Sequence, residues 1–440
     1  MPTADPTPRP PATGTTTTTD ATCLACGCLC DDIAVTVAGG RVVAAERACA
    51  LGLPSFLEPH PGSGGPAATV DGRPVATGAA LDRAAALLGA ARSPVIWGLT
   101  RSSIEAVGAA LALADRLGAT VDLAGSSGRA ARRAAFVRVG AVTATLGEVK
   151  DRAGVVLFWG GHPDATHPRH GGRYSIARPG RFVPGRRTVA VVDVGDGPIA
   201  GEADVRVALA ADRQEAALGV LLALAQGVAL DPARVETATG HPLATWRGLI
   251  DLLRGVPVGA IGFGPGAGSL GATGWDRAWG LVRALNADRR RCLGFDLGEP
   301  GNAAGAAAVL TWQAGAPGWL DFGGIGPRHL PGEATLADRL ATGAVDAVLA
   351  VGLDPADHLD PAGVARLVAV PRVVIAPDAC RPGPAVAPPP ASAIAVGRLG
   401  IEAGGTVARV DGAMLPLRPA LAGPIPDDRT ILRDLLTRLG

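Results

Sequence analysis

Five cysteines near the start of the chain are the residues best suited to bind a metal. Three of them form a Cys23-x2-Cys26-x3-Cys30 run, and Cys49 follows after an interval long enough for a short hairpin. This spacing lets one loop supply three thiolates to a [4Fe–4S] cluster while a separate turn supplies the fourth. Under that interpretation Cys28 is the spare thiol. A tetrahedral zinc site could use four of the same thiols, and the thiols could also be vestigial or simply packed without a metal, so all three alternatives stay open.

The other expectations for the cysteines concern disulfide formation and burial in the core. Disulfides are not expected, because no secretory signal precedes the cysteines and because they crowd into one loop. Cys292 and Cys380 are isolated in the sequence and are predicted to be core residues.

A second set of candidate residues lies in glycine-rich loops that follow predicted strands. Gly160 and His162 follow one strand, Gly264 and Gly266 follow another, and Asp354 follows a third. One such loop alone is most often a simple turn. At the carboxyl ends of several parallel strands, however, such loops can together cradle a large nucleotide-like cofactor. The set therefore predicts a cofactor-binding site.

The elements that must position these residues alternate between strands and helices. Apolar runs predict strands at 95–97, 120–123, 155–158, 188–192, 205–209, 258–261, 347–351 and 373–375. Helical spacing predicts helices at 104–117, 214–226, 275–285 and 336–340. This alternation predicts an α/β protein with several doubly wound parallel-sheet domains. Alternating residues over 33–37 and 41–44, joined by Gly39-Gly40, predict a hairpin that turns Cys49 back toward the cysteine loop.

Composition shifts along the chain predict its division into domains. The Pro- and Thr-rich residues 1–20 are expected to be a disordered tail, followed by a cysteine-rich β segment over 21–60. An α/β domain is predicted over 70–200, completed by 335–400. A second α/β domain is predicted over 201–334, and a C-terminal segment over 401–440.

Composition also limits the classes of partner. The 440 residues carry a net charge of only +1, with dispersed basic residues. This excludes the basic patches typical of nucleic-acid or anionic-membrane binding. No apolar stretch is long enough to span a bilayer. A cytoplasmic protein is expected.

Several motifs together resemble the B subunit of formylmethanofuran dehydrogenase, a member of the molybdopterin oxidoreductase superfamily. The resemblance runs from the cysteine loop almost to the C-terminus. The stretches that carry it are the cysteine run with Asp31-Asp32-Ile33, residues 145–150, 159–163 with 167–170, 298–302 with 311–315, 331–333 and 405–411. It implies the molybdopterin oxidoreductase fold and a role within an enzyme complex acting on one-carbon units carried by methanofuran. In the archaeal enzyme this subunit holds a [4Fe–4S] cluster and a molybdo- or tungstopterin that interconverts CO2 and formate. The resemblance adds Asn302 as a residue that could hydrogen-bond the pterin.

The chain departs from the family at the metal ligand. The family places a ligating cysteine in a Cys-His-Gly-Pro motif at a fixed distance before Thr-Leu-Gly-Glu-Val-Lys. Here the same distance falls on Gly128 and Arg129. Glycine offers no ligand atom, and arginine cannot act as a base near neutral pH. One arginine of the family is also missing before Pro331, although Arg328 remains. No catalytic residue is therefore assigned.

The resemblance leaves two functions open. Bacterial relatives with this loss belong to the formyltransferase/hydrolase complex. That complex moves a formyl group from tetrahydromethanopterin to a methanofuran analogue and hydrolyses it to formate, using other subunits for the chemistry. We expect a redox-inactive scaffold subunit of such a complex. The alternative is an active dehydrogenase subunit with a [4Fe–4S] cluster and a molybdo- or tungstopterin. In both cases the partners are the other subunits of the complex.

Overall fold

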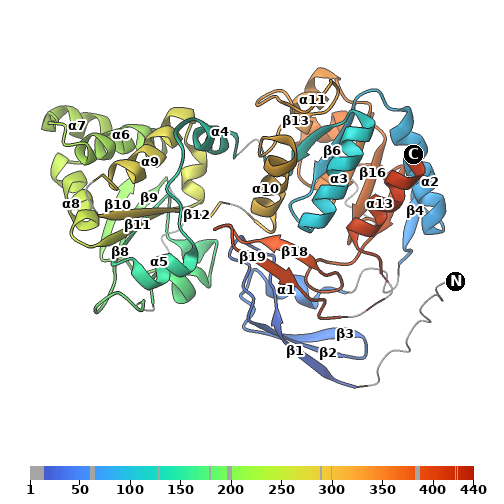
Figure 1. Ribbon diagram of the computed structural model, residues 1–440, viewed down its shortest axis with the longest axis horizontal. Coiled ribbons are helices and arrows are strands. Elements are labelled where there is room, and N and C mark those ends of the chain that lie inside the picture. The colour runs from blue at the N-terminus through green and yellow to red at the C-terminus, as the bar shows by residue number, and fades with distance from the viewer. Residues whose placement is uncertain are drawn as a thin grey trace. The chain divides into compact units, whose positions relative to one another are not determined.

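The chain folds into two compact units, each built around its own parallel sheet (Figure 1). The computed structural model describes residues 14–59, 65–126, 129–177, 180–195, 201–287, 290–298, 300–381, 387–421, 423 and 425–440. Unit 1 comprises residues 1–126, 300–409 and 414–440, and unit 2 comprises 127–299 and 410–413.

Unit 1 contains a nine-stranded sheet in the order β14-β13-β7-β6-β15-β16-β17-β4-β5. Its central strands from β7 to β17 are parallel, while β13, β14, β4 and β5 form antiparallel edges. The strands are β4 (Ala68–Val70), β5 (Arg73–Pro74), β6 (Pro94–Gly98), β7 (Thr120–Leu123), β13 (Leu320–Asp321), β14 (Arg328–His329), β15 (Ala347–Val351), β16 (Arg372–Ala376) and β17 (Ser392–Ala395).

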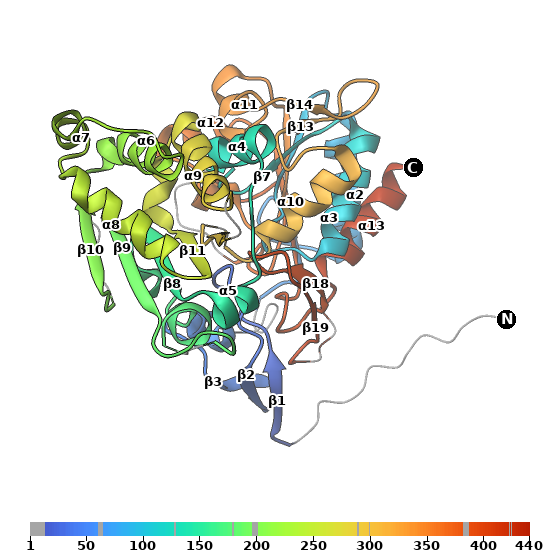
Figure 2. The ribbon, with the colours of Figure 1, turned by 60° about the vertical axis from the view of Figure 1, so that its left-hand side comes forward.

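Helices cover both faces of this sheet because successive strand residues point to opposite sides. Leu349 and Val351 pack with one layer of helices, whereas Val348 and Ala350 pack with the other. The first layer contains α2 (Thr77–Ala90), α3 (Ile104–Leu117), α10 (Ala303–Ala314) and α13 (Asp428–Leu439). The second contains α11 (Leu336–Thr342) and α12 (Pro361–Leu367). Figures 1 and 2 both show α2, α3 and α13 side by side.

Local signals set the ends of α3, the helix that follows β6. The Ser103 side chain accepts a hydrogen bond from the Ala106 N–H, which caps the first turn. Gly118 ends the helix with φ +63°, a conformation that glycine adopts without a Cβ penalty. These signals place α3 at the predicted residues 104–117.

The N-terminal part of unit 1 is a small antiparallel sheet beside the cysteine loop. It consists of β1 (Thr16–Ala21), β2 (Ile33–Ala38) and β3 (Arg41–Glu46), followed by α1 (Leu53–Leu57). The predicted hairpin is present as β2 and β3. The prediction of a disordered tail is wrong for residues 16–20, because β1 pairs with β2; residues 1–13 lie outside the described residues. A second small sheet joins β18 (Gly405–Ala408) to β19 (Met414–Leu417).

Unit 2 contains a five-stranded, entirely parallel sheet in the order β10-β9-β8-β11-β12. Figure 2 shows β10, β9 and β8 side by side in that order. The strands are β8 (Val155–Trp159), β9 (Thr188–Val194), β10 (Val205–Leu209), β11 (Val258–Phe263) and β12 (Arg291–Asp296). The helices are α4 (Ala130–Val139), α5 (Leu146–Arg152), α6 (Gln214–Ala225), α7 (Pro232–Thr239), α8 (Leu243–Arg254) and α9 (Ala272–Ala284). Short 3-10 or π turns lie at Pro163–Ala165, Gly171–Ser175, Ala211–Arg213, Pro265–Ser269 and, in unit 1, Pro355–Asp357.

The structure confirms α/β architecture with parallel sheets but divides the chain differently from the prediction. We expected 127–200 to belong with the first domain. Instead β8 and β9 pair with each other, and β8 pairs with β11, so both strands belong to unit 2. Residues 300–334 and the C-terminal helix α13 belong to unit 1, where α13 packs on α2 and α3. Alternation predicts that strands exist but not which remote strands pair.

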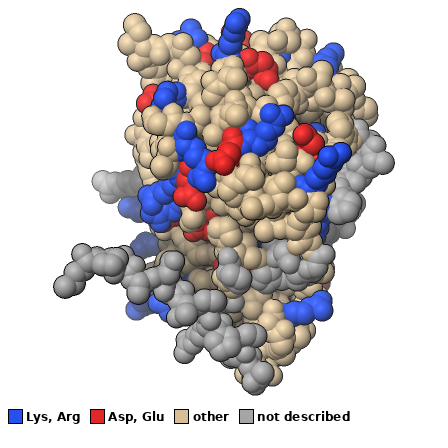
Figure 3. All heavy atoms as spheres, turned by 90° about the vertical axis from the view of Figure 1, so that its right-hand side faces the viewer, with Lys and Arg blue, Asp and Glu red and all other residues tan. Residues whose placement is uncertain are grey.

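The charged residues of one face are mixed in sign (Figure 3). Basic and acidic side chains are interspersed there, as expected for a net charge of +1. Among the described residues, no helix combines the length and the apolar character that crossing a bilayer requires.

Asp428 in the first turn of α13 should make the stability of the protein depend on pH. Burial raises the pKa of this carboxyl from 3.8 to about 6, partly offset by a hydrogen bond with Ser102. The folded state therefore holds a proton that the unfolded state loses, and the free energy of unfolding falls as pH rises from about 4 to about 6. Asp428→Asn should be more stable than the wild type at pH 7.5, by about 2–3 kcal/mol, but not at pH 4. Thermal unfolding of both proteins across this range checks the prediction, and parallel pH profiles would contradict it.

Candidate functional site

The cysteine loop between β1 and β2 is folded back on itself. The Cys23 N–H donates to the Cys30 carbonyl over 2.8 Å, and the Leu29 N–H donates to the Cys26 carbonyl over 3.3 Å. Leu29 has φ +40°, which is a strained conformation for a branched residue. Its side chain is fully buried against Val407 and Leu417, and this packing holds the strained turn in place.

Cys49 lies in the turn that leads into α1. Its carbonyl accepts hydrogen bonds from the N–H groups of Gly52 and Leu53, at 3.0 and 2.9 Å. Gly52 in turn lies against the loop: a Cβ at this position would be 2.5 Å from Cys23 Sγ. The first turn of α1 therefore sets where Cys49 lies relative to Cys23.

The thiols of the four predicted ligands interact electrostatically. The pKa of Cys23 is raised to about 12, mainly by burial and to a smaller extent by the charges of Cys30, Cys26 and Cys49, in that order. Each of the three other thiols therefore lies near enough to Cys23 to affect its ionisation. A cation there would remove this repulsion, since thiolates are the form that binds metals. The donor set thus fits a metal or an iron–sulfur cluster.

Cys28 has a role that the sequence analysis missed. We treated it as a spare thiol, but hydrogen bonds from its side chain and backbone lower the pKa of Cys26 to about 7, against the effect of burial. Only one residue separates Cys26 from Cys28, so the spacing itself was the available signal. Cys292 is buried in the core of unit 2, as predicted, and Cys380 is half-buried with its Sγ 3.5 Å from the Ala393 carbonyl.

Gly52→Ala should disrupt this site without straining the backbone. The backbone of Gly52 is right-handed (φ −88°, ψ −32°), so alanine is tolerated locally, and only the contact with Cys23 Sγ changes. Overpacking of this kind costs about 1–3 kcal/mol. We expect a lower melting temperature and less iron or zinc in anaerobically purified protein. Gly78→Ala, in α2 with nothing within 4 Å of the added Cβ, is the matched control. Equal behaviour of the two variants would contradict the prediction.

The predicted cofactor glycines of unit 2 lie at the point where its strand order reverses, between β8 and β11. Gly160 follows β8, and Gly264 and Gly266 follow β11. The two loops are in direct backbone contact: Gly264 N donates to the Trp159 carbonyl over 2.8 Å, and Gly266 N donates to the Gly160 carbonyl over 3.0 Å. A Cβ on Gly160 would be 2.4 Å from Ala267 N. The glycines thus let two loops pack together at the position where open α/β sheets bind ligands.

Substitutions of the neighbouring residues Gly160 and Gly161 can separate the cost of backbone strain from the cost of overpacking. Gly160 (φ +86°) and Gly161 (φ +108°) both require a conformation unfavourable for alanine, but a Cβ on Gly161 meets nothing within 4 Å. We expect Gly161→Ala to cost about 1–3 kcal/mol from strain. Gly160→Ala should cost about 1–3 kcal/mol more, because the contacted backbone cannot move aside. Denaturant unfolding measures both, and equal losses would show that the contact between the loops contributes nothing.

The histidines after β8 are buried in unit 2. His162 accepts a hydrogen bond from the Asp164 N–H over 3.3 Å and caps the turn that follows, while burial lowers its pKa. His170 stacks on Phe295 with 5.5 Å between ring centroids, and burial lowers its pKa to about 3. His170 is therefore neutral at neutral pH and offers no positive charge to an anion. His162 serves as a cap in this structure.

The remaining predicted cofactor residues, in unit 1, make structural contacts. The Asn302 amide donates to the Ser102 carbonyl over 2.7 Å and accepts from the Ala408 N–H over 2.8 Å, joining three remote segments. Asp354 accepts from the Ala356 N–H and pairs with Arg372. Asp354 also lines a cavity of about 550 Å³.

A further cavity lies where the strand order of unit 1 reverses, between β6 and β15. Its volume is about 370 Å³. Arg101 lines it after β6, Gly352 lines it after β15, and Leu24 and Ala25 of the cysteine loop form another wall. The sequence analysis missed this site, although Gly98 and Gly352, which follow the two predicted strands, were a usable signal.

The position that the sequence analysis matched to the family's metal-ligating cysteine carries no thiol. Gly128 lies outside the described residues, and Arg129 is the residue that precedes α4. One turn later Arg132 pairs with Asp296 and lies over the Trp275 ring, 5.9 Å from its centroid. Guanidinium groups stay protonated and cannot ligate a metal. A molybdenum or tungsten centre that needs a cysteine ligand does not fit these residues.

Comparison with known proteins identifies the family. No family model matches the chain. It is 30% identical over 439 residues to the B subunit of tungsten-containing formylmethanofuran dehydrogenase 2 of Methanocaldococcus jannaschii, covering 96% of this chain and 98% of the relative. The chain belongs to the family of formylmethanofuran dehydrogenase B subunits. The same subunit of Methanococcus maripaludis is also 30% identical, over 436 residues, with the same coverage.

The chain is also similar to a bacterial protein in sequence and to two solved structures in fold. The B subunit of the formyltransferase/hydrolase complex Fhc of Methylorubrum extorquens is 30% identical over 292 residues, 66% of this chain and 75% of that protein. The crystal structure of the FhcABCD complex with methylofuran matches with a TM-score of 0.68 and 27% identity, covering 85% of this chain and 98% of that chain. Acetylene hydratase from Pelobacter acetylenicus matches with a TM-score of 0.60 at 14% identity, covering 96% and 69%, and shows the fold alone. The predicted family and the molybdopterin-type fold are confirmed.

Proposed function

We propose that this chain is the redox-inactive B subunit of a formyltransferase/hydrolase complex that releases formate from a methanofuran-type carrier. In this role it organises its partner subunits and does not itself transfer electrons. The similarity to a chain of the FhcABCD complex, which covers 98% of that chain, supports this assembly.

The observation that carries the proposal is the replacement of the family's Cys-His pair by Gly128 and Arg129. Loss of a ligand that contacts the metal removes both affinity and reactivity. Arg129 leads into a helix whose next arginine, Arg132, is paired with Asp296 and stacked over Trp275. Nothing in this set can replace a thiolate as a metal ligand.

The second candidate function is an active subunit with a molybdo- or tungstopterin that interconverts CO2 and a formyl group. The match to the tungsten-containing enzyme over 96% of the chain favours it. So do the glycine loops at the strand-order reversal of unit 2, where a cofactor could approach Gly160, Gly264 and Gly266. Of the six residues predicted to bind a cofactor, His162 caps its own turn, whereas Asn302 and Asp354 bind remote segments of the chain.

We further propose that Cys23, Cys26, Cys30 and Cys49 hold a [4Fe–4S] cluster, with zinc as the alternative metal. A cluster supplies one-electron transfer, which is of no use without a redox centre to connect. In a scaffold subunit, the same metal would crosslink the loop before β2 to the turn before α1 and so stabilise the N-terminal segment.

Metal analysis of the anaerobically purified complex tests the function. We expect iron or zinc bound to the cysteines but no stoichiometric molybdenum or tungsten, and formate release from the formylated carrier without reduction of a viologen dye. The tungsten-containing enzyme of Methanocaldococcus jannaschii, measured in the same way, is the positive control. Stoichiometric tungsten or molybdenum together with dye reduction would overturn the scaffold proposal in favour of the dehydrogenase.

A further inference from the structure

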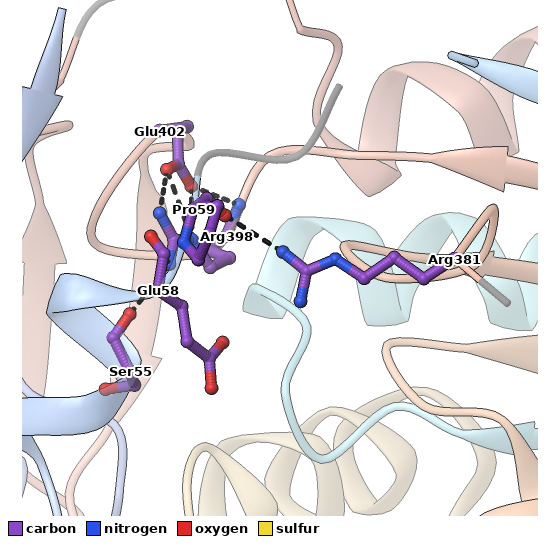
Figure 4. Close-up of polar contacts among 6 residues, drawn as sticks. All are labelled: Ser55, Glu58, Pro59, Arg381, Arg398 and Glu402. Carbon is purple, nitrogen blue, oxygen red and sulfur yellow. Dashed lines mark hydrogen bonds and ion pairs between the residues drawn. The ribbon is translucent and has the colours of Figure 1, made fainter. Parts of the chain in front are cut away.

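Two arginines that are remote in sequence hold the C-terminal end of α1 (Figure 4). Arg398 Nη1 donates to the Ser55 carbonyl over 2.8 Å and to the Glu58 carbonyl over 3.2 Å. Arg381 Nη2 donates to the Pro59 carbonyl over 2.9 Å. Figure 4 shows both guanidinium groups directed at this short stretch of backbone.

Glu402 fixes the Arg398 side chain. Its carboxylate, which is fully buried, accepts from Arg398 Nε and from the Arg398 backbone N–H, both at 2.9 Å, and also pairs with Nη2. The pair leaves only Nη1 to reach α1. Because Arg398 follows β17 closely, the large sheet of unit 1 determines where this nitrogen lies.

Helix α1 needs such support because it is too short to be stable alone. It has five residues, no side-chain hydrogen bond at its N-cap, no basic residue in its last turn, and only Phe56 buried. Helices of this length are marginal, and their last carbonyls have no partner within the helix. Positive charge at this end is also favourable for the helix dipole. Arg398 and Arg381 supply both the missing donors and the charge.

The other end of α1 determines the position of a predicted metal ligand. The Cys49 carbonyl accepts from the first N–H groups of the α1 turn, Ser55 Oγ donates back to the Gly52 carbonyl over 2.7 Å, and Gly52 lies against Cys23 Sγ. A continuous chain of contacts thus leads from Arg398, through Ser55 and Gly52, to Cys49 and Cys23.

We infer that Arg398, held by Glu402 and assisted by Arg381, is a positioning residue for Cys49. It docks α1 onto the sheet and so brings the fourth thiol to the other three. The metal role of Cys49 belongs to the proposed function, but the docking of α1 does not depend on it. The two ideas can therefore fail separately.

Alkylation of Cys49 in the metal-free, full-length chain tests the docking directly. Mass spectrometry gives a rate for each cysteine, and Cys292 and Cys380 serve as internal reporters of unfolding. In Arg398→Met, Cys49 should react about tenfold faster or more, because the hydrogen bonds that this charged donor makes to α1 are lost, with Cys292 and Cys380 unchanged. The alkylation rate of Cys49 in Arg398→Lys should lie between the rates in the wild type and in Arg398→Met. Lysine keeps the positive charge but loses the bidentate interaction with Glu402. Glu402→Gln is the milder variant if Arg398→Met does not fold.

Arg438→Met is the matched control, because it breaks an arginine–carboxylate pair with Asp82 elsewhere in unit 1, at 2.9 Å. It should leave the rate for Cys49 unchanged. An unchanged rate in Arg398→Met and Glu402→Gln would overturn the inference. So would faster reaction of all cysteines together with a lower melting temperature, since the pair would then stabilise the whole unit and not position Cys49.

Metal retention provides the second measurement. Loss of a residue that orients a ligand typically lowers metal affinity by about tenfold to a hundredfold. We expect Arg398→Met to release iron or zinc to a chelator faster by that factor, and a bound cluster to show an altered electron paramagnetic resonance spectrum after reduction. Arg398→Lys should restore part of both properties. If the wild type binds no metal, the metal role of the cysteines is wrong, whereas the alkylation rates still decide the docking of α1. Metal release at the wild-type rate would overturn the positioning role.

Discussion

The parallel pairing of β6 with β15 is the constraint on which the rest of unit 1 depends. Val95 pairs with Val348 and Gly98 with Val351, so two segments far apart in the chain become neighbours. The strand order reverses at this pair, and the chain leaves it through Arg101 on one side and Gly352 on the other. The cavity at their carboxyl ends follows from this reversal, as it does in open α/β sheets generally. Unit 1 is discontinuous in sequence for the same reason. Residues 127–299 of unit 2 lie between β6 and its partner strand β15 in the chain.

The N-terminal segment depends on that sheet in turn. Its own sheet has three short strands, and its one helix has five residues. Such elements bury little surface by themselves. Its attachments are long-range: Leu29 is buried with Val407 and Leu417, and the end of α1 is bound by Arg398 and Arg381. The cysteines of the loop are therefore arranged by residues that come from the last part of the chain.

Several residues predicted to bind a cofactor make contacts within the fold instead. Asn302 was predicted to hydrogen-bond a pterin, yet both ends of its amide are used to join backbone at Ser102 and Ala408. His162 caps a turn, and buried His170 is neutral. The glycines of unit 2 bring two loops into contact. Each of these contacts stabilises the fold without a metal.

The amino-acid sequence by itself determined the family, the α/β class and most individual elements. Period-two and period-3.6 patterns and capping residues such as Ser103 are local, so α3 and the strands 120–123, 205–209 and 347–351 lie at the predicted residues. The spacing of the cysteines is likewise local and named the candidate ligands. Only the tertiary structure decided which strands pair, and so where the units begin and end. It also decided that Cys28 hydrogen-bonds to Cys26 and that Arg398 binds the end of α1. Pairing and packing between remote segments depend on the whole folded chain, and no local pattern encodes them.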